Sequence, residues 1–366
     1  MLGNMMNGQL LISGLIEHAE KYHSDVEIVS RSVEGPIHRY TYTDAAKRSR
    51  KLANALTKLG LKEGDTVGTL AWNTFRHFEL YFGVSGIGCV VNTVNPRLFP
   101  EQLTYIINHA ENQYLFIDLS FVELVESLQG ELKGVKGFVI LTDRENMPDT
   151  KLANTICYEE LISDESEDFQ WPEFDENTAS SLCYTSGTTG NPKGVLYSHR
   201  STILHAWIVS SGNVAKVSSS SCILPVVPMF HVNAWGIPYA GAMFGAKLVF
   251  PGPALDGASL FELIDNEKPD LLMGVPTVWL GLLQHLRETN QTLDCVETAL
   301  VGGSAAPRAM IQEFEEEHDV FLMHGWGMTE MSPLGTATSR TKEMDNLDLE
   351  KRYDLQQKQG KAFFGV

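Results

Sequence analysis

Short segments that are apolar throughout alternate with amphipathic segments along most of this chain, and this alternation limits the folds open to it. Strands are expected within 64–73 and at 89–93, 114–118, 137–141, 179–184, 195–198, 222–225, 247–250, 270–274, 298–301 and 320–324. Helices are expected at 8–23, 45–59, 76–86, 100–110, 121–128, 200–211, 235–244, 258–266, 277–288 and 308–317. Strands without polar alternation are usually buried on both faces, so the pattern predicts an α/β fold with parallel or mixed sheets flanked by helices.

Residues 143–178 interrupt the alternation. They are rich in Asp, Glu and Asn, and they include the acidic run 163–168. A run of charges is usually a solvated face, so we expect a loop here that borders two lobes. The sequence therefore predicts two α/β subdomains, at 1–176 and 177–366.

The overall composition excludes several classes of partner. The 366 residues carry a net charge of -18, from 28 basic and 46 acidic side chains, which argues against a nucleic-acid surface. The sequence contains no stretch of 18 apolar residues, so it predicts no membrane span. Residues 1–15 contain no Lys or Arg, which makes them a poor signal peptide. The five cysteines are scattered without metal-binding spacing, and we expect buried thiols in a reducing cytoplasm.

The stretch 184–194, Tyr-Thr-Ser-Gly-Thr-Thr-Gly-Asn-Pro-Lys-Gly, is the most distinctive in the chain. Glycines let the backbone approach polyphosphate oxygens closely, and the hydroxyls and the Lys193 ammonium add donors and charge. The stretch lacks the Walker A spacing. A flexible linker is the alternative, but both flanks read as strands, and this favours a structured phosphate-binding loop.

Three further stretches carry groups that could act on a ligand. His231 follows a strand end and a proline, the position where open α/β sheets bind ligands, although a lone His among apolar residues is most often a core His. For Trp235 in the same stretch, a plain core aromatic is the alternative to a role in ligand binding. The turn 302–307 is glycine-rich and could cradle an anion or simply turn the chain. Glu330 follows a hydroxyl and two glycines and suits Mg²⁺, although taken alone it could be a surface acid.

These stretches together resemble the adenylate-forming superfamily, which includes acyl-CoA synthetases, luciferases and peptide-synthetase adenylation domains. The resemblance rests on the phosphate loop, on Phe-His-Val-Asn-Ala-Trp at 230–235, on Gly-Gly-Ser at 302–304 and on Trp-Gly-Met-Thr-Glu at 326–330, in the order that the superfamily has them. It extends over essentially the whole chain. It implies the large N-terminal domain of such an enzyme.

The resemblance also implies a role for each matched residue. The nucleotide phosphates would contact Thr185, Ser186, Gly187, Thr188, Thr189, Gly190 and Lys193. The adenine side would be formed by Gly302, Gly303, Ser304, Trp326, Gly327 and Met328, and the α-phosphate would contact Thr329. The acid would lie against His231, Val232, Trp235, Gly302 and Gly327, and Mg²⁺ would be bound by Glu330 with Thr185. Catalysis would fall to Lys193, Thr185, His231, Thr329 and Glu330.

The implied reaction joins a small carboxylic acid to coenzyme A at the expense of ATP, with Mg²⁺. Residues 95–103, 230–235 and 332–336 resemble the branch that holds medium- and long-chain fatty-acid-CoA ligases and 3-methylmercaptopropionate-CoA ligases. Long-chain synthetases suggest a homodimer by analogy.

One departure from the family concerns the end of the chain. The family continues with an Asp that binds the ribose, a hinge and a C-terminal lid with a catalytic Lys, and these letters do not include them. We therefore expect an incomplete ligase that binds nucleotide weakly and forms acyl-adenylate poorly. The alternatives are a ligase for another acid class, a non-catalytic acyl- or nucleotide-binding module, and a phosphotransferase that releases ADP.

Overall fold

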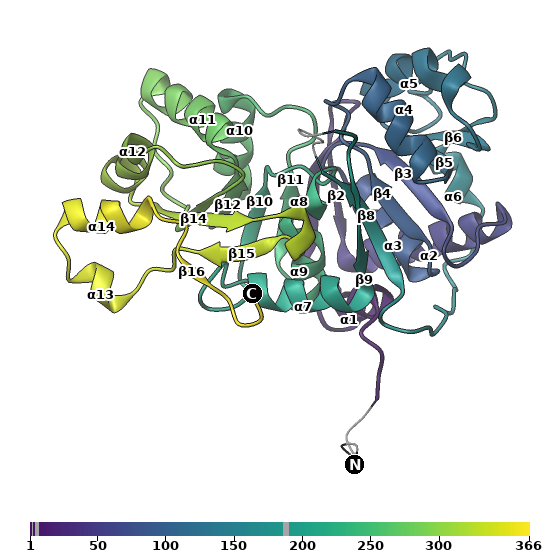
Figure 1. Cartoon of the computed structure of the whole chain (residues 1–366). Coiled ribbons are helices and arrows are strands. Elements are labelled where there is room, and N and C mark those ends of the chain that lie inside the picture. The colour runs from purple at the N-terminus through teal and green to yellow at the C-terminus, as the bar shows by residue number, and fades with distance from the viewer. Residues whose placement is uncertain (2, 4–6, 186–189) are drawn as a thin grey trace.

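The computed structural model describes residues 1, 3, 7–185 and 190–366, and it contains two large sheets (Figure 1). The first has the order β7-β6-β5-β3-β4-β8-β9. Its strands are β3 (Thr66–Leu70), β4 (Val90–Thr93), β5 (Asn112–Ile117), β6 (Gly137–Ile140), β7 (Thr155–Cys157), β8 (Ala179–Tyr184) and β9 (Gly194–Ser198). All neighbours are parallel except β8 and β9, which form an antiparallel hairpin.

The second sheet has the order β16-β15-β14-β13-β12-β10-β11-β1-β2. Its strands are β1 (Glu27–Arg31), β2 (Ile37–Thr41), β10 (Cys222–Pro225), β11 (Lys247–Phe250), β12 (Leu271–Gly274), β13 (Thr298–Val301), β14 (Phe321–Gly327), β15 (Leu334–Ala337) and β16 (Lys361–Ala362). The strands from β14 through β13, β12, β10 and β11 to β1 are parallel, and antiparallel strands close both edges. The predicted α/β class, with parallel and mixed sheets flanked by helices, is confirmed.

Helices cover both sheets. They are α1 (Ile12–Tyr22), α2 (Tyr42–Lys58), α3 (Phe75–Gly86), α4 (Pro100–His109), α5 (Val122–Leu128), α6 (Tyr158–Ser163), α7 (His199–Val209), α8 (Val232–Trp235), α9 (Ile237–Phe244), α10 (Gly257–Glu267), α11 (Pro276–Thr289), α12 (Arg308–His318), α13 (Lys342–Asp345) and α14 (Leu349–Gln356). In the described part of the chain, no helix is long and apolar enough to cross a bilayer.

The hydrophobic core is layered. One cluster joins the inner faces of both sheets, with Val67 from the first and Leu248 from the second, and α1, α2, α3, α7 and α9 lie within it. A second cluster packs α10, α11 and α12 on the outer face of the second sheet, and a third packs α4 and α5 on the outer face of the first. The helices between the sheets therefore contribute side chains to a core that both sheets share (Figure 1).

Strands are exchanged between the two halves of the sequence. The β1–β2 hairpin, which the sequence analysis missed, precedes the first sheet in the chain but pairs with β11 of the second. The predicted subdomain boundary at residue 176 stays a prediction. Each sheet contains strands from both sides of it, since β1 and β2 join the second sheet and β8 and β9 join the first. The acidic segment expected to be a loop over 143–178 also contains β7 and α6, which extend the first sheet and cover it.

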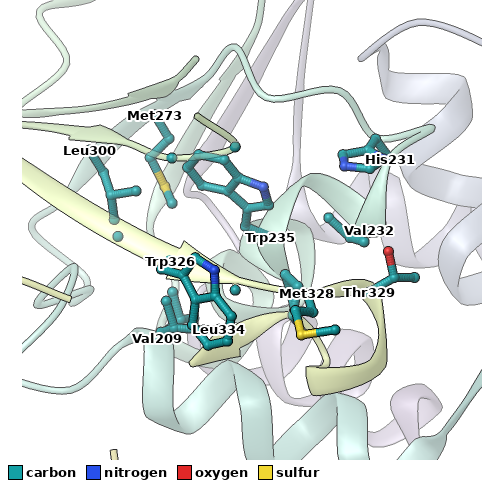
Figure 2. Close-up of a pocket in the computed structure, with 15 residues that line it drawn as sticks. Val209, His231, Val232, Trp235, Met273, Leu300, Trp326, Met328, Thr329 and Leu334 are labelled. Atoms are coloured by element: carbon teal, nitrogen blue, oxygen red, sulfur yellow. The ribbon is translucent and has the colours of Figure 1, made fainter. Parts of the chain in front are cut away.

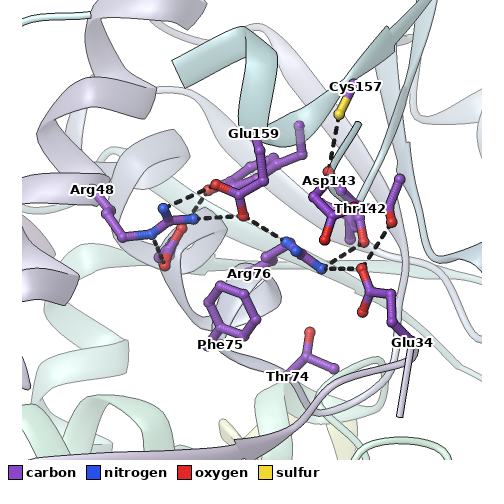
Figure 3. Close-up of polar contacts among 12 residues, drawn as sticks. Glu34, Arg48, Thr74, Phe75, Arg76, Thr142, Asp143, Cys157 and Glu159 are labelled. Carbon is purple, nitrogen blue, oxygen red and sulfur yellow. Dashed lines mark hydrogen bonds and ion pairs between the residues drawn. The ribbon is translucent and has the colours of Figure 1, made fainter. Parts of the chain in front are cut away.

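A buried ionic network ties the β1–β2 hairpin to the first lobe (Figure 3). Glu34, between β1 and β2, accepts a bond of 2.7 Å from Arg76 of α3. Glu159 of α6 accepts from both Arg76 and Arg48. Arg48 also donates to Glu79, at 2.7 Å, and the Glu79 side chain is fully buried. Charges buried this way require their partners, because an unpaired ion cannot recover its lost hydration.

Replacing Glu79 should therefore be costly. We expect Glu79→Leu to lower the free energy of unfolding by about 2–4 kcal/mol. This is slightly less than the cost of leaving a buried charge with no partner, because Arg48 still pairs with Glu159. The matched variant is Glu160→Leu, in the exposed pair with Arg144, which should cost less than about 1 kcal/mol. Urea unfolding at neutral pH measures both, and equal costs would contradict the assignment.

A second buried carboxyl lies just after β5. Asp118 is 1% exposed, and it accepts a bond of 2.6 Å from the backbone N–H of Trp72. Burial raises the pKa of Asp118 to about 7, against the lowering effect of that bond and of Arg76. Between about pH 4 and pH 7 the folded chain therefore holds a proton here that the unfolded chain releases, so this group lowers stability as the pH rises.

Asp118→Asn should remove that pH dependence and keep an oxygen for the Trp72 N–H. Between pH 5 and pH 8, the free energy of unfolding of the variant should rise by on the order of 2–4 kcal/mol relative to that of the parent. Denaturant midpoints at the two pH values measure the difference. Parallel pH profiles for the two proteins would show that Asp118 is already ionised at pH 5.

Candidate active site

The residues predicted to contact the acid and the adenine lie at the carboxyl ends of parallel strands in the second sheet. Strands β10, β12, β13 and β14 are parallel, so their carboxyl ends meet there. His231 follows β10, Gly302 follows β13, and Trp326 lies at the end of β14. This edge is where open α/β sheets bind ligands.

A cavity of about 90 Å³ lies between these strand ends (Figure 2). Nine of the predicted residues line it, namely His231, Val232, Trp235, Gly302, Gly303, Trp326, Gly327, Met328 and Thr329. The sequence analysis missed the rest of the lining, which is Val209, Met273, Leu300, Gly325, Pro333 and Leu334. In sequence, an apolar residue that lines a cavity looks the same as one in the core, so no pattern could have singled out these residues.

The phosphate-loop stretch joins β8 to β9. Thr185 and Lys193 close its base, because the Thr185 N–H donates to the Lys193 carbonyl at 3.0 Å and the Lys193 N–H donates to the Thr185 hydroxyl at 3.1 Å. The Lys193 side chain is exposed. The predicted contacts Ser186, Gly187, Thr188 and Thr189 lie outside the described residues. Five predicted residues do not line the cavity, namely Thr185, Gly190, Lys193, Ser304 and Glu330.

Tyr197 connects this hairpin to the end of β14. Its hydroxyl donates to the Thr329 carbonyl at 2.5 Å, and it lies on β9, four residues after Lys193. Burial raises the pKa of Tyr197 well above its usual value, and the nearby Glu330 carboxylate adds to the rise. The strand that starts at the phosphate loop therefore contacts the segment that carries Thr329 and Glu330. Sequence reasoning missed Tyr197, which has the pattern of an ordinary strand residue.

The loop that leads to His231 is held from the first lobe. Buried Asn73 donates to the carbonyls of Pro225 and Val227 at 2.8 Å and accepts from the Met229 N–H at 2.7 Å. Tyr81 donates to the Met229 carbonyl at 2.5 Å. These bonds fix the backbone just before His231.

The chain next makes a left-handed turn. Val232, Asn233, Ala234 and Trp235 have φ values of 43°, 54°, 49° and 53°, and Gly236 follows at 77°. The right-handed helix expected over 235–244 therefore begins only at Ile237. L-residues pay roughly 1–2 kcal/mol each for this conformation, so the surrounding structure must hold it.

The polar groups of the site differ in their surroundings. The His231 side chain reaches the surface, yet the protein around it lowers its pKa by removing water, so the imidazole is neutral at pH 7. Trp326 is 44% exposed, and its indole lies on Gly335, where a Cβ would come within 2.8 Å of the ring. The site thus offers an accessible indole face and a neutral imidazole beside an apolar cavity.

Glu330 is an exposed carboxylate, and no cation pairs with it in the described part of the chain. Within the same residues, no three His, Cys, Asp or Glu side chains converge as a metal site would require. A cation bound here would take Glu330 as one ligand and draw the others from its substrate. Mg²⁺ is usually held in this way, by one or two carboxylates and phosphate oxygens.

The chain is similar to known proteins over its whole length. The family profile of AMP-binding enzymes matches residues 15–366. The chain is 50% identical to a 3-methylmercaptopropionyl-CoA ligase from Ruegeria lacuscaerulensis, over 100% of this chain and 68% of that protein. It is 48% identical to a medium-chain-fatty-acid–CoA ligase from Ectopseudomonas oleovorans, over 100% of this chain and 67% of that protein. The chain thus spans about two thirds of the length of these relatives.

Solved structures show the same fold. An anthranilate CoA ligase in complex with anthranoyl-AMP superposes with a TM-score of 0.84 at 21% identity, covering 97% of this chain and 65% of that one. A long-chain-fatty-acid-CoA ligase from Archaeoglobus fulgidus superposes with a TM-score of 0.82 at 20% identity, covering 99% of this chain and 71% of that one.

Removing the Tyr197 hydroxyl should loosen the end of β14. Tyr197→Phe leaves the Thr329 carbonyl without its donor, and we expect a cost of about 1–2 kcal/mol and faster amide exchange over 325–335. The matched variant is Tyr353→Phe, which removes a hydroxyl from α14 that bonds Glu316. Hydrogen exchange by mass spectrometry measures both, and unchanged protection over 325–335 in Tyr197→Phe would show that this bond does not hold the segment.

Proposed function

The chain belongs to the family of AMP-binding enzymes, and on that premise we propose that it activates a carboxylic acid with ATP for transfer to coenzyme A. One observation carries the proposal. The carboxyl ends of β10, β13 and β14 surround an apolar cavity, and the phosphate-loop hairpin bonds the segment that borders it. An acid in the cavity would then lie beside a nucleotide on the loop.

The proposed reaction has two steps. A carboxylate oxygen attacks the α-phosphorus of ATP, the bond to the bridging oxygen breaks, and pyrophosphate leaves an acyl-adenylate. The thiolate of coenzyme A then attacks the acyl carbon, and AMP leaves. Catalysis of the first step is mainly positioning and neutralisation of charge.

Residues of this chain are assigned to that step as follows. Lys193, with the Thr185 hydroxyl, would contact the phosphates, and Thr329 the α-phosphate. Trp326 would stack on adenine beside the turn of Gly302, Gly303 and Ser304. Bound Mg²⁺ supplies charge neutralisation for the phosphates, and the exposed Glu330 carboxylate would hold it. The neutral His231 would hydrogen-bond the substrate carboxylate.

The size of the cavity bears on the acid. A cavity of about 90 Å³ is small, so we expect the tail beyond the carboxylate to be short when Trp235 lies as it does here. Its lining includes the rings of Trp235 and Trp326, and thioether sulfur contacts aromatic rings favourably. We assign a methylthio-alkanoic acid as the preferred substrate, with a medium-chain fatty acid as the second candidate.

The cellular location and the oligomeric state also stay proposals. All five cysteines are unpaired, which suits the reducing cytoplasm. A homodimer is proposed by analogy with long-chain synthetases.

A product assay tests the proposed function. The purified chain is incubated with Mg²⁺-ATP, coenzyme A and one of 3-methylmercaptopropionate, octanoate or benzoate, and the nucleotides are separated by chromatography. We expect acid-dependent pyrophosphate and AMP at a low rate, in line with the poor acyl-adenylate formation expected from the sequence, with 3-methylmercaptopropionate the best substrate. ADP would identify a phosphotransferase, a preference for benzoate would indicate another acid class, and calorimetric binding without turnover would indicate a binding module.

Two variants test the assigned residues. Lys193→Met and Glu330→Gln should each lower pyrophosphate release by about 10²–10³-fold, because both act on charge that develops during transfer. The loss in Glu330→Gln should fall on kcat more than on the KM for the acid. Lys133→Met and Glu317→Gln, both exposed and outside the site, are the matched controls. Wild-type rates in the site variants would contradict the assignment.

A further inference from the structure

The left-handed turn over 232–236 requires an explanation of what holds it. Val232, Asn233 and Ala234 are all buried, and each has a positive φ that L-residues rarely adopt. Consecutive L-residues in this region occur only where the surroundings over-determine the backbone. The turn forms one wall of the cavity, so whatever holds it also sets the shape of that wall.

Asn233 is the side chain that anchors the turn to the first sheet. It is 2% exposed, and its amide N–H donates to the Ser181 hydroxyl at 2.8 Å. The Cys183 thiol lies 3.5 Å from the Asn233 amide oxygen, to which it donates. Ser181 and Cys183 are two residues apart on β8 and so face the same side of the sheet. Both ends of the amide are therefore satisfied by the strand that leads into the phosphate loop.

The packing of the turn leaves little room for another arrangement. His205 lies under Gly236, where a Cβ would come within 2.6 Å of its Nδ1. On the other side, a Cβ at Gly302 would lie 3.1 Å from the Trp235 ring, so the indole rests on that glycine. Figure 2 shows Trp235 between Met273 and Val232, at the cavity. A small change in the turn would therefore move the indole.

We propose that Asn233 is a positioning residue for the acid substrate. By tying the turn to Ser181 and Cys183, its amide keeps residues 232–235 left-handed and keeps the Trp235 indole against Gly302, and this sets the width of the acid pocket. The bond also connects the pocket wall to the strand that carries the nucleotide loop. The inference rests on the proposed function only in taking the cavity as the acid site.

Kinetics separate positioning from general loss of structure. Asn233→Ala should raise the KM for 3-methylmercaptopropionate by about ten-fold or more and change the KM for ATP by less than about three-fold. Adding Ala234→Gly to Asn233→Ala should recover at least about three-fold of the loss, because glycine adopts positive φ without strain. Equal rises in both KM values, or no rescue by the glycine, would overturn the proposal.

A matched control removes another Asn from a left-handed position. Asn290 ends α11 with a φ of 53° and is exposed, far in sequence from the turn. Asn290→Ala should change stability without changing the KM for the acid. A rise in that KM equal to the rise in Asn233→Ala would show that the effect is not local.

Crystal structures provide a test that does not depend on turnover. In Asn233→Ala we expect residues 232–235 to leave the left-handed region and the indole to leave Gly302. If the turn and Trp235 stay in place, the proposal is wrong. If the parent chain turns over no acid, the proposed function fails, while the structures still decide the role of Asn233.

Discussion

The contact between the β8–β9 hairpin and the edge of the second sheet is the interaction on which the site depends. The hairpin belongs to the first sheet, yet β9 bonds the Thr329 carbonyl through Tyr197 and β8 bonds Asn233 through Ser181. Groups that would serve the nucleotide and groups that would serve the acid are therefore held by one pair of strands. The Asn233 bond is buried and the Tyr197 bond is partly buried, and hydrogen bonds shielded from water are costly to break, so they fix the relative placement of both sides.

Much of the fold could be predicted because it is encoded in local patterns. Uniformly apolar strands between amphipathic helices indicate buried parallel sheets, and the predicted strands from 89–93 to 320–324 correspond to β4 to β6 and β8 to β14, with β7 missed. Which strands pair is a non-local property. Nothing around β1 shows that its neighbour is β11, more than two hundred residues later, and so the exchange of the β1–β2 hairpin could not be predicted.

The candidate site was partly predictable for similar reasons. Glycine, hydroxyl and carboxylate groups at strand ends can be recognised in the sequence, and nine of the predicted residues surround one cavity. The left-handed turn could not be recognised, because Val232 and Ala234 give no sign of positive φ and the amide contact that holds the turn is distant in sequence. Tyr197 likewise reads as a strand residue until its partner Thr329 is seen.

The exchanged hairpin also bears on how the protein is made. β1 and β2 leave the ribosome before the other strands described here, but β1 finds its parallel neighbour only when β11, ending at Phe250, has been synthesised. Until then its edge is open, and an unpaired strand edge is prone to join another chain. The first lobe can gather its own strands β3 to β9 during this interval. The time needed to synthesise residues 42–250 therefore sets the shortest interval over which this edge stays open.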